Sequence, residues 1–186
     1  MSAGEITVTE IKSAIELAME RTKGLQLSSE ERKKIKEEEI IAKAQGLVNR
    51  FLQVDFHLRD MEKELAKFDP DQRGHLEQLI FYYLVEAIHF DKENDLVFQG
   101  IEAYRKGSLK SISPIRKLIE NYQENNRKEY QKITEELLNK FKSLGISGTA
   151  VLPKVDGSRE WKDALSQLKP GYEDQLRTLK RELHEG

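Results

Sequence analysis

The residues whose types and spacing are best suited to metal binding or catalysis are Glu86 and His89. They form an E-x-x-H pair inside the most apolar stretch of the chain. On a helix this spacing puts a carboxylate and an imidazole on one face, as di-iron carboxylate bundles require. Such a site needs a second E-x-x-H, yet Val54, Gln72 and Arg181 stand three positions before the other histidines. Two copies of the chain could complete the site. A metal-dependent enzyme built on Glu86 and His89 is therefore one alternative.

A second group of side chains could bind an anion. No acid occurs from Ala103 to Ile119, and cations surround Ser113-Pro114, a typical helix start. The group consists of Arg105, Lys106, Lys110, Ser113, Arg116 and Lys117. Free backbone N–H groups and the positive end of a helix dipole favour phosphate or carboxylate. The cluster predicts a nucleic-acid or phospholigand binder as another alternative, although a chain with 34% charged residues also produces such clusters by chance.

Composition narrows the remaining classes of function. No nucleotide-binding, metalloprotease or nucleophile-elbow motif occurs, so the sequence assigns no catalytic residue and no cofactor. Cysteine is absent, which excludes disulfides and thiolate catalysis and fits a reducing compartment. The net charge of −2 supplies no overall field for nucleic acid or anionic lipid. Without an export signal or a long apolar run, we expect a cytoplasmic protein with no membrane association.

The stretch from Leu76 to Phe90 is the densest in apolar residues and predicts a central, fully wrapped helix. Asp69-Pro70 provides its start, with an N-cap carboxylate followed by proline at the first helical position. A buried strand is the rival interpretation, but the interleaved polar residues favour a helix. Before it, a short helix is expected between Thr7 and Gly24.

The longest periodic run begins at the capping-box pair Ser28 and Glu31, and we expect one uninterrupted helix to Phe68. Its apolar positions repeat every 3.5 residues, which predicts supercoiled, coiled-coil-like packing. They are Ile40, Ala44, Leu47, Phe51, Val54, Leu58, Met61, Leu65 and Phe68. Leu52 and Phe56 lie off this seam, and we predict that they bind another helix of the chain or a second subunit.

After a predicted cap at Asn94, either a short helix or a continuation of the central helix is expected, and then a second long helix from Ser113 to Leu144. Residues 145–157 are rich in glycine and β-branched residues and predict an extended linker. Within it, Ile146, Val151 and Leu152 either cover the bundle or form an edge strand or docking peptide for another chain. Residues 158–186 predict two short helices separated at Pro170-Gly171.

Together these patterns predict an all-α protein. We expect an elongated antiparallel helical bundle over residues 1–144 that contains the long coiled-coil-like helix, then the linker 145–157, and a helical C-terminal segment at 158–186. The leading functional hypothesis is a non-enzymatic scaffold or adaptor that binds protein partners and forms homo-oligomers. Its predicted partner-binding residues are Leu52, Phe56, Val151 and Leu152.

Overall fold

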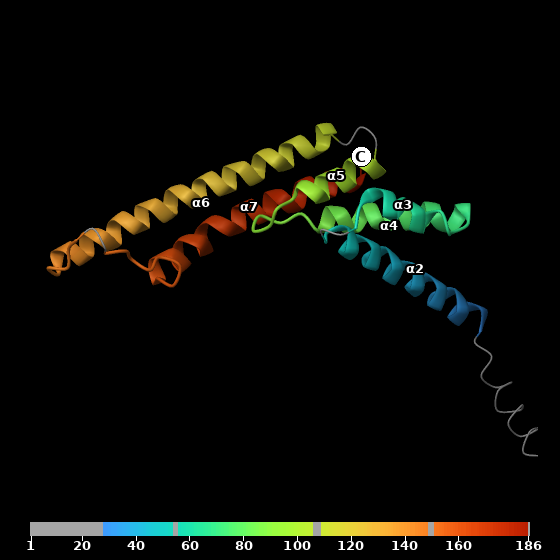
Figure 1. Cartoon of the computed structure of the whole chain (residues 1–186), viewed down its shortest axis with the longest axis horizontal. Coiled ribbons are helices and arrows are strands. Elements are labelled where there is room, and N and C mark those ends of the chain that lie inside the picture. The colour runs from blue at the N-terminus through green and yellow to red at the C-terminus, as the bar shows by residue number, and fades with distance from the viewer. Residues whose placement is uncertain (1–27, 54–55, 106–108, 149–150, 186) are drawn as a thin grey trace, which may run out of the picture. The chain divides into compact units, whose positions relative to one another are not determined.

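The computed structural model describes residues 28–53, 56–105, 109–148 and 151–185, without the side chains of 109–111 (Figure 1). Throughout this described part the regular structure is helical, so the predicted all-α class is confirmed. None of the helices described there combines the length and apolarity that spanning a membrane would require. The chain divides into two compact units, Met1–Ile41 and Ala42–Gly186.

In the first unit the structure describes only the beginning of α2 (Ser29–Phe51). The predicted capping box is confirmed: Ser28 N–H donates to Glu31 Oε2 at 2.7 Å, and Glu31 N–H donates to Ser28 Oγ at 3.1 Å. These bonds stabilise the carboxylate and lower the pKa of Glu31. From Ser29 to Glu39 every side chain is exposed, so these turns depend on capping and local charge pairs. The helix predicted between Thr7 and Gly24 lies outside the described residues.

The prediction of one uninterrupted helix from Ser28 to Phe68 is wrong. The helix α2 ends at Phe51, and a separate α3 (Leu58–Leu65) carries the second half of the apolar repeat. A local restart explains the break, because Asp60 Oδ2 accepts from the His57 N–H at 3.4 Å, an N-terminal capping contact. Since two helices share the repeat, it does not form a single supercoiled stripe.

The core of the second unit includes side chains from α2, α3, the central helix α4 (Pro70–Glu86) and α5 (Asp95–Tyr104). The two halves of the apolar repeat both contribute to it through Ala44, Leu47, Phe51, Met61 and Leu65. The helix α4 packs against α3, α5 and the C-terminal helix α7 (Arg159–Glu185). These five seam positions are buried in two helices, whereas Ile40, Leu58 and Phe68 are half-buried and Val54 lies outside the described residues.

The predicted start of α4 is confirmed, because Asp69 Oδ1 accepts from the Gln72 N–H at 3.0 Å and proline follows the cap. Two details differ from the prediction of a fully wrapped helix that reaches Phe90. Tyr82 is exposed, and the helix ends at Glu86. The chain leaves the helix there because the buried Asn94 side chain binds the backbone of the connection instead. Its Oδ1 accepts from the His89 N–H, and its Nδ2 donates to the carbonyls of His89 and Lys92.

A close approach between three helices occurs at Gly100 of α5. A Cβ atom at this position would lie 2.9 Å from Leu84 Cδ1 and 2.9 Å from Phe51 Cε1. Both neighbours are buried, so the absence of a side chain is what lets α5 approach α4 and the end of α2.

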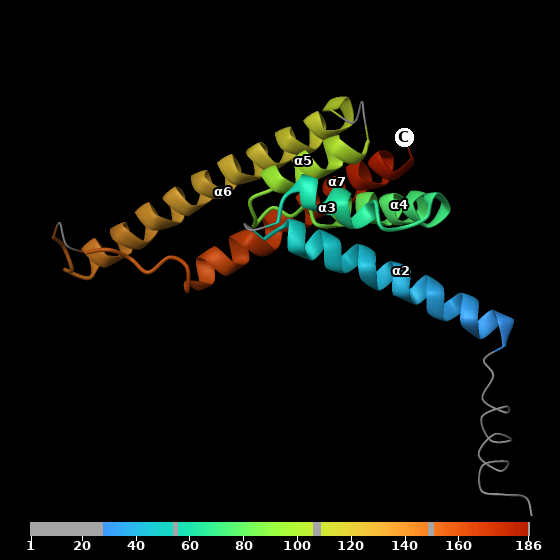
Figure 2. The ribbon, with the colours of Figure 1, turned by 45° about the vertical axis from the view of Figure 1, so that its right-hand side comes forward.

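The helices α6 (Leu109–Ser143) and α7 form an antiparallel hairpin, in which they lie side by side in both views (Figures 1 and 2). Successive contacts define the register. Tyr122 packs edge-on against Tyr172 with ring centroids 5.3 Å apart, and Tyr130 packs against Trp161 at 5.2 Å. At the far end, Lys140 pairs with Glu160 at 3.9 Å.

Both helix boundaries predicted from proline were misplaced. The helix α6 starts at Leu109 and contains Pro114, so Ser113-Pro114 is not its first turn. The helix α7 continues through Pro170-Gly171 rather than splitting in two. Packing against α6 and α4 compensates for the backbone hydrogen bond that proline removes. The C-terminal segment therefore belongs to the same compact unit as the central helices.

Candidate functional site

The turn that joins α6 to α7 is held at both ends by specific backbone contacts. At the end of α6, the Ile146 N–H donates to the Phe141 carbonyl and the Gly145 N–H to the Lys142 carbonyl, both at 3.0 Å. With Gly145 at a φ of 78°, these bonds form a Schellman motif. At the start of α7, the Trp161 N–H donates to Ser158 Oγ at 3.1 Å, which makes Ser158 the N-cap.

The side chains of this turn are unusually exposed for their type. Among the large apolar side chains that the structure describes, the three most exposed are Leu152 at 87%, Leu144 at 68% and Ile146 at 50%. They stand within nine residues of one another, whereas the nearby Val155 is buried and anchors the returning chain. Scattered apolar residues are normal on a protein surface, but a local group of this kind marks a binding surface.

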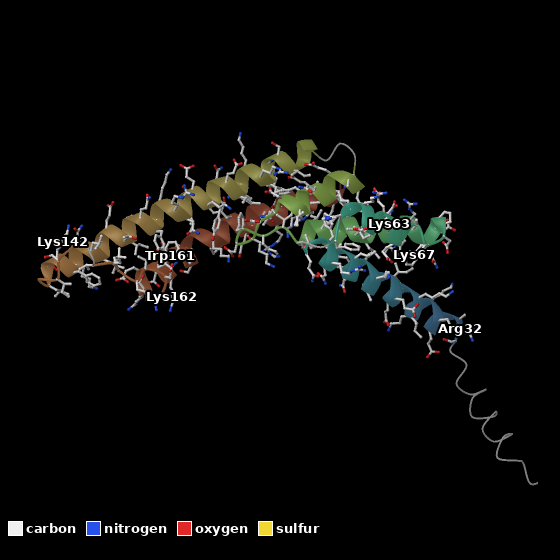
Figure 3. The ribbon with its side chains drawn as sticks, viewed as in Figure 1. Arg32, Lys63, Lys67, Lys142, Trp161 and Lys162 are labelled. Carbon is white, nitrogen blue, oxygen red and sulfur yellow. The ribbon has the colours of Figure 1, made fainter. Side chains whose placement is uncertain are left out.

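The chain segment that carries these side chains, residues 142–154, contains basic residues and no acidic ones. No Asp or Glu occurs from Leu137 to Val155, and Lys142 and Lys154 have no carboxylate partner among the described residues. Figure 3 shows Lys142 at the turn end of the hairpin and Trp161 at the first turn of α7. We define the turn surface as Leu144, Ile146, Leu152, Lys142 and Lys154. It is an apolar patch with a basic border.

The four predicted partner-binding residues fall in two different environments. Leu52 is half-buried, and Phe56 is buried beneath the Arg50 guanidinium, which lies 4.2 Å from its ring centroid. Val151 is half-buried, whereas Leu152 is the most exposed large apolar residue described. The structure thus brings only Leu152 into the turn surface.

Leu144 and Ile146 of the turn surface are not among the partner-binding residues predicted from the sequence, although Ile146 lies in the predicted linker. Leu144 continued the apolar period of the long helix, which predicts burial. Their exposure could have been predicted from their position on either side of Gly145. The helix ends there, and no neighbouring helix among the described residues covers that end. Apolar residues at a helix terminus beyond its last packing contact have nothing to cover them.

The described arginines of the predicted anion cluster are engaged by acceptors of the chain itself. The Arg105 guanidinium donates to the Leu183 carbonyl at 2.6 Å and stacks over Phe81. The Arg116 guanidinium lies 3.7 Å from Asp95 and from Glu102, and 4.2 Å from the centroid of the Phe98 ring.

The remaining members of that cluster do not define a helix N-terminus. Ser113 and Lys117 are exposed inside α6, several residues after its start. Lys106 lies outside the described residues, and the side chain of Lys110 is likewise not described. The described residues therefore add no structural support to the anion-binding prediction.

Glu86 and His89 do not share a helical face, because α4 ends at Glu86. Glu86 instead interacts with α7: its Oε1 lies 3.3 Å from His184 Nε2, and its Oε2 lies 3.6 Å from Lys180 Nζ. Partial burial lowers the pKa of His89, and the ammonium groups of Lys180 and Lys92 lower it further. Across the described residues, no cluster of three acidic or histidine side chains is placed to hold a metal ion.

Lys180 has a structural role at this contact. Its Nζ donates to the Glu86 carbonyl at 2.9 Å, so the ammonium caps the C-terminal end of α4. Burial lowers the pKa of Lys180, and the neighbouring Glu86 carboxylate partly opposes that shift. Together with Arg105 on the Leu183 carbonyl, the contact fixes the end of α7 against α4 and α5.

A hollow of about 690 Å³ lies where the connection between α4 and α5 faces α6. Its lining includes Asn94, Arg116, Glu120 and Asn126. Asn126 Oδ1 is buried without a hydrogen-bond partner among the described residues. Charges of both signs line the hollow, so it shows no preference for one class of ligand.

Searches against protein-family models, curated proteins and solved structures found no match to this chain. A functional assignment therefore rests on the chemistry of its own surfaces.

Proposed function

We propose that this chain is a non-enzymatic helical interaction module, a scaffold or adaptor that binds a partner protein through the turn surface. One observation carries the proposal: Leu144, Ile146 and Leu152 are exposed together on a turn whose backbone is fixed at both ends. Burying three aliphatic side chains supplies roughly 1.5–3 kcal/mol each before the costs of association. The contacts that hold the two ends of the turn keep those costs low.

The two alternatives from the sequence are less well supported. A nucleic-acid or phospholigand site at residues 105–117 would use Arg105 and Arg116, whose guanidinium groups already contact acceptors of the chain. A metal-dependent enzyme would use Glu86 and His89, which lie at and beyond the end of α4. Cytoplasmic location and homo-oligomerisation belong to the same proposal as the interaction module.

Site-specific photo-crosslinking in the cells that naturally produce the chain tests this function. A photoreactive residue replaces Leu152 in one variant and Leu96, an exposed apolar residue of α5, in the matched control. We expect discrete protein adducts at position 152 and none of the same mass at position 96. The adducts should disappear when Leu144→Asp is added. Identical adduct patterns at both positions, or no protein adduct at position 152, would contradict the proposal.

A further inference from the structure

The first turns of α2 carry a surface that complements the turn surface in charge. Ile35 is exposed at 39%, although it is a large aliphatic residue. On a helix its neighbours at three- and four-residue spacing include Glu31, Glu38 and Glu39, all of them exposed. Arg32 also borders Ile35 but has an interaction of its own. We define the α2 face as Ile35 with Glu31, Glu38 and Glu39.

We propose that the turn surface of one copy binds the α2 face of a second copy. The inference rests on the proposed function and names its partner. Each surface has an apolar centre, Leu152 with its neighbours on one and Ile35 on the other. Each has a border of one predominant charge, lysine on the turn surface and glutamate on the α2 face. Contact buries apolar area and brings opposite charges together.

The contact can be used in two ways. If it is not reciprocated it is heterologous, and each added copy leaves one surface of each type free, which gives open arrays or closed rings. If two copies make the contact reciprocally, they close a two-fold dimer. Each surface is small, which places the contact among weak interfaces. We expect a dissociation constant on the order of 10–100 µM that weakens at high salt, since the border charges are solvent-exposed.

Sedimentation velocity on two complementary variants tests this arrangement. Leu152→Asp removes the turn surface, and the pair E38K/E39K reverses the charge of the α2 face. All three positions are exposed, so both variants are expected to fold, which melting curves check. Wild type should self-associate near 500 µM, and each variant alone should sediment as a monomer. An equimolar mixture of the two variants should form a dimer and nothing larger, because only one productive contact remains. Leu96→Asp is the control and should associate as wild type does.

Several results would overturn the inference. A monomeric wild type at 500 µM would do so, as would a mixture in which both variants stay monomeric. Association lost in L152D but kept in E38K/E39K would indicate a symmetric contact between turn surfaces. If wild type binds phosphatidylserine vesicles, L152D does not, and neither self-associates, the turn surface is a lipid-binding surface instead. If position 152 crosslinks other proteins while wild type is monomeric, only this inference fails. If position 152 crosslinks no protein, the proposed function fails with it.

Discussion

Replacing Gly100 with alanine tests the close packing of three helices directly. The new Cβ atom would lie 2.9 Å from Leu84 Cδ1 and from Phe51 Cε1, and 3.0 Å from Leu84 Cδ2. Favourable carbon–carbon contacts begin near 3.5 Å, so all three separations are short by roughly half an ångström. Leu84 and Phe51 are both buried and have little space to move into. Overpacking of this kind costs about 1–3 kcal/mol.

The helix propensity of alanine opposes this cost by about 1 kcal/mol. We therefore expect Gly100→Ala to lower the free energy of unfolding by about 0–2 kcal/mol, which corresponds to a fall in melting temperature of up to about 8 °C. Gly74→Ala in α4 is the matched control, because nothing lies within 4 Å of its Cβ position. That control should gain about 0.5–1 kcal/mol. Urea unfolding followed by circular dichroism measures both changes.

A double variant separates the clash from any effect on the backbone. Leu84→Ala alone should cost about 2–5 kcal/mol, since it removes a fully buried side chain. It also creates room for the new methyl group at position 100. The combined variant should therefore lose less stability than the sum of the two single changes. The reasoning fails if Gly100→Ala gains as much stability as Gly74→Ala, or if the two changes are additive.

Three further predictions concern other parts of the second unit. The hydroxyl of Tyr104 is buried without a partner among the described residues, so Tyr104→Phe should raise the free energy of unfolding by about 1 kcal/mol, unlike the same change at exposed Tyr82. Burial raises the pKa of Tyr104, so above about pH 10 the unfolded chain loses the Tyr104 proton before the folded chain does, and the stability of the wild type falls. Phenylalanine cannot ionise, so the stability advantage of Y104F should grow in melting curves recorded from about pH 9 to 11. Asn94→Ala removes three hydrogen bonds in the α4–α5 connection and should lower the free energy of unfolding in urea by about 2–4 kcal/mol. A decrease of less than about 0.5 kcal/mol would show that Asn94 does not fix the turn. Pro170→Ala restores a backbone donor inside α7 and should stabilise the chain by up to about 3 kcal/mol, with an unchanged or lower melting temperature as the contrary result.

Local signals in the sequence were sufficient for much of the fold. The helix class, the capping box at Ser28 and the start of α4 at Asp69 all follow from interactions within four residues, which the sequence displays directly. The break between α2 and α3 was not predicted, because the apolar repeat continues across it. A repeat reports which residues are buried, but it does not report whether one helix or two bury them.

Both misplaced proline boundaries have the same physical origin. Proline at Pro114 or Pro170 disfavours a helix locally, and sequence reasoning has only this local preference to use. Packing of α6 against α7 is a tertiary effect that outweighs it. The departure of the chain at Glu86 is similar, because it depends on the side chain of Asn94 eight residues later.

The candidate site was predicted only in part. Leu152 was recognised because an apolar residue in a glycine-rich segment lacks a helical face to occupy. Leu144 and Ile146 were not recognised, because their exposure depends on where α6 ends and on where along α6 the helix α7 begins. The contacts of Arg105 and Glu86 with α7 join residues about 80 to 100 positions apart, so no local pattern could reveal them.

The register of the hairpin separates the turn from the core. The aromatic contact of Tyr130 with Trp161 lies 13 residues before the end of α6 at Ser143, a length of about 20 Å in an α-helix. Beyond that contact, the polar interactions that the structure describes for α6 lie within α6, with α7 or within the turn. Substitutions in the turn surface should therefore leave the aromatic contacts of the hairpin and the core of the second unit in place.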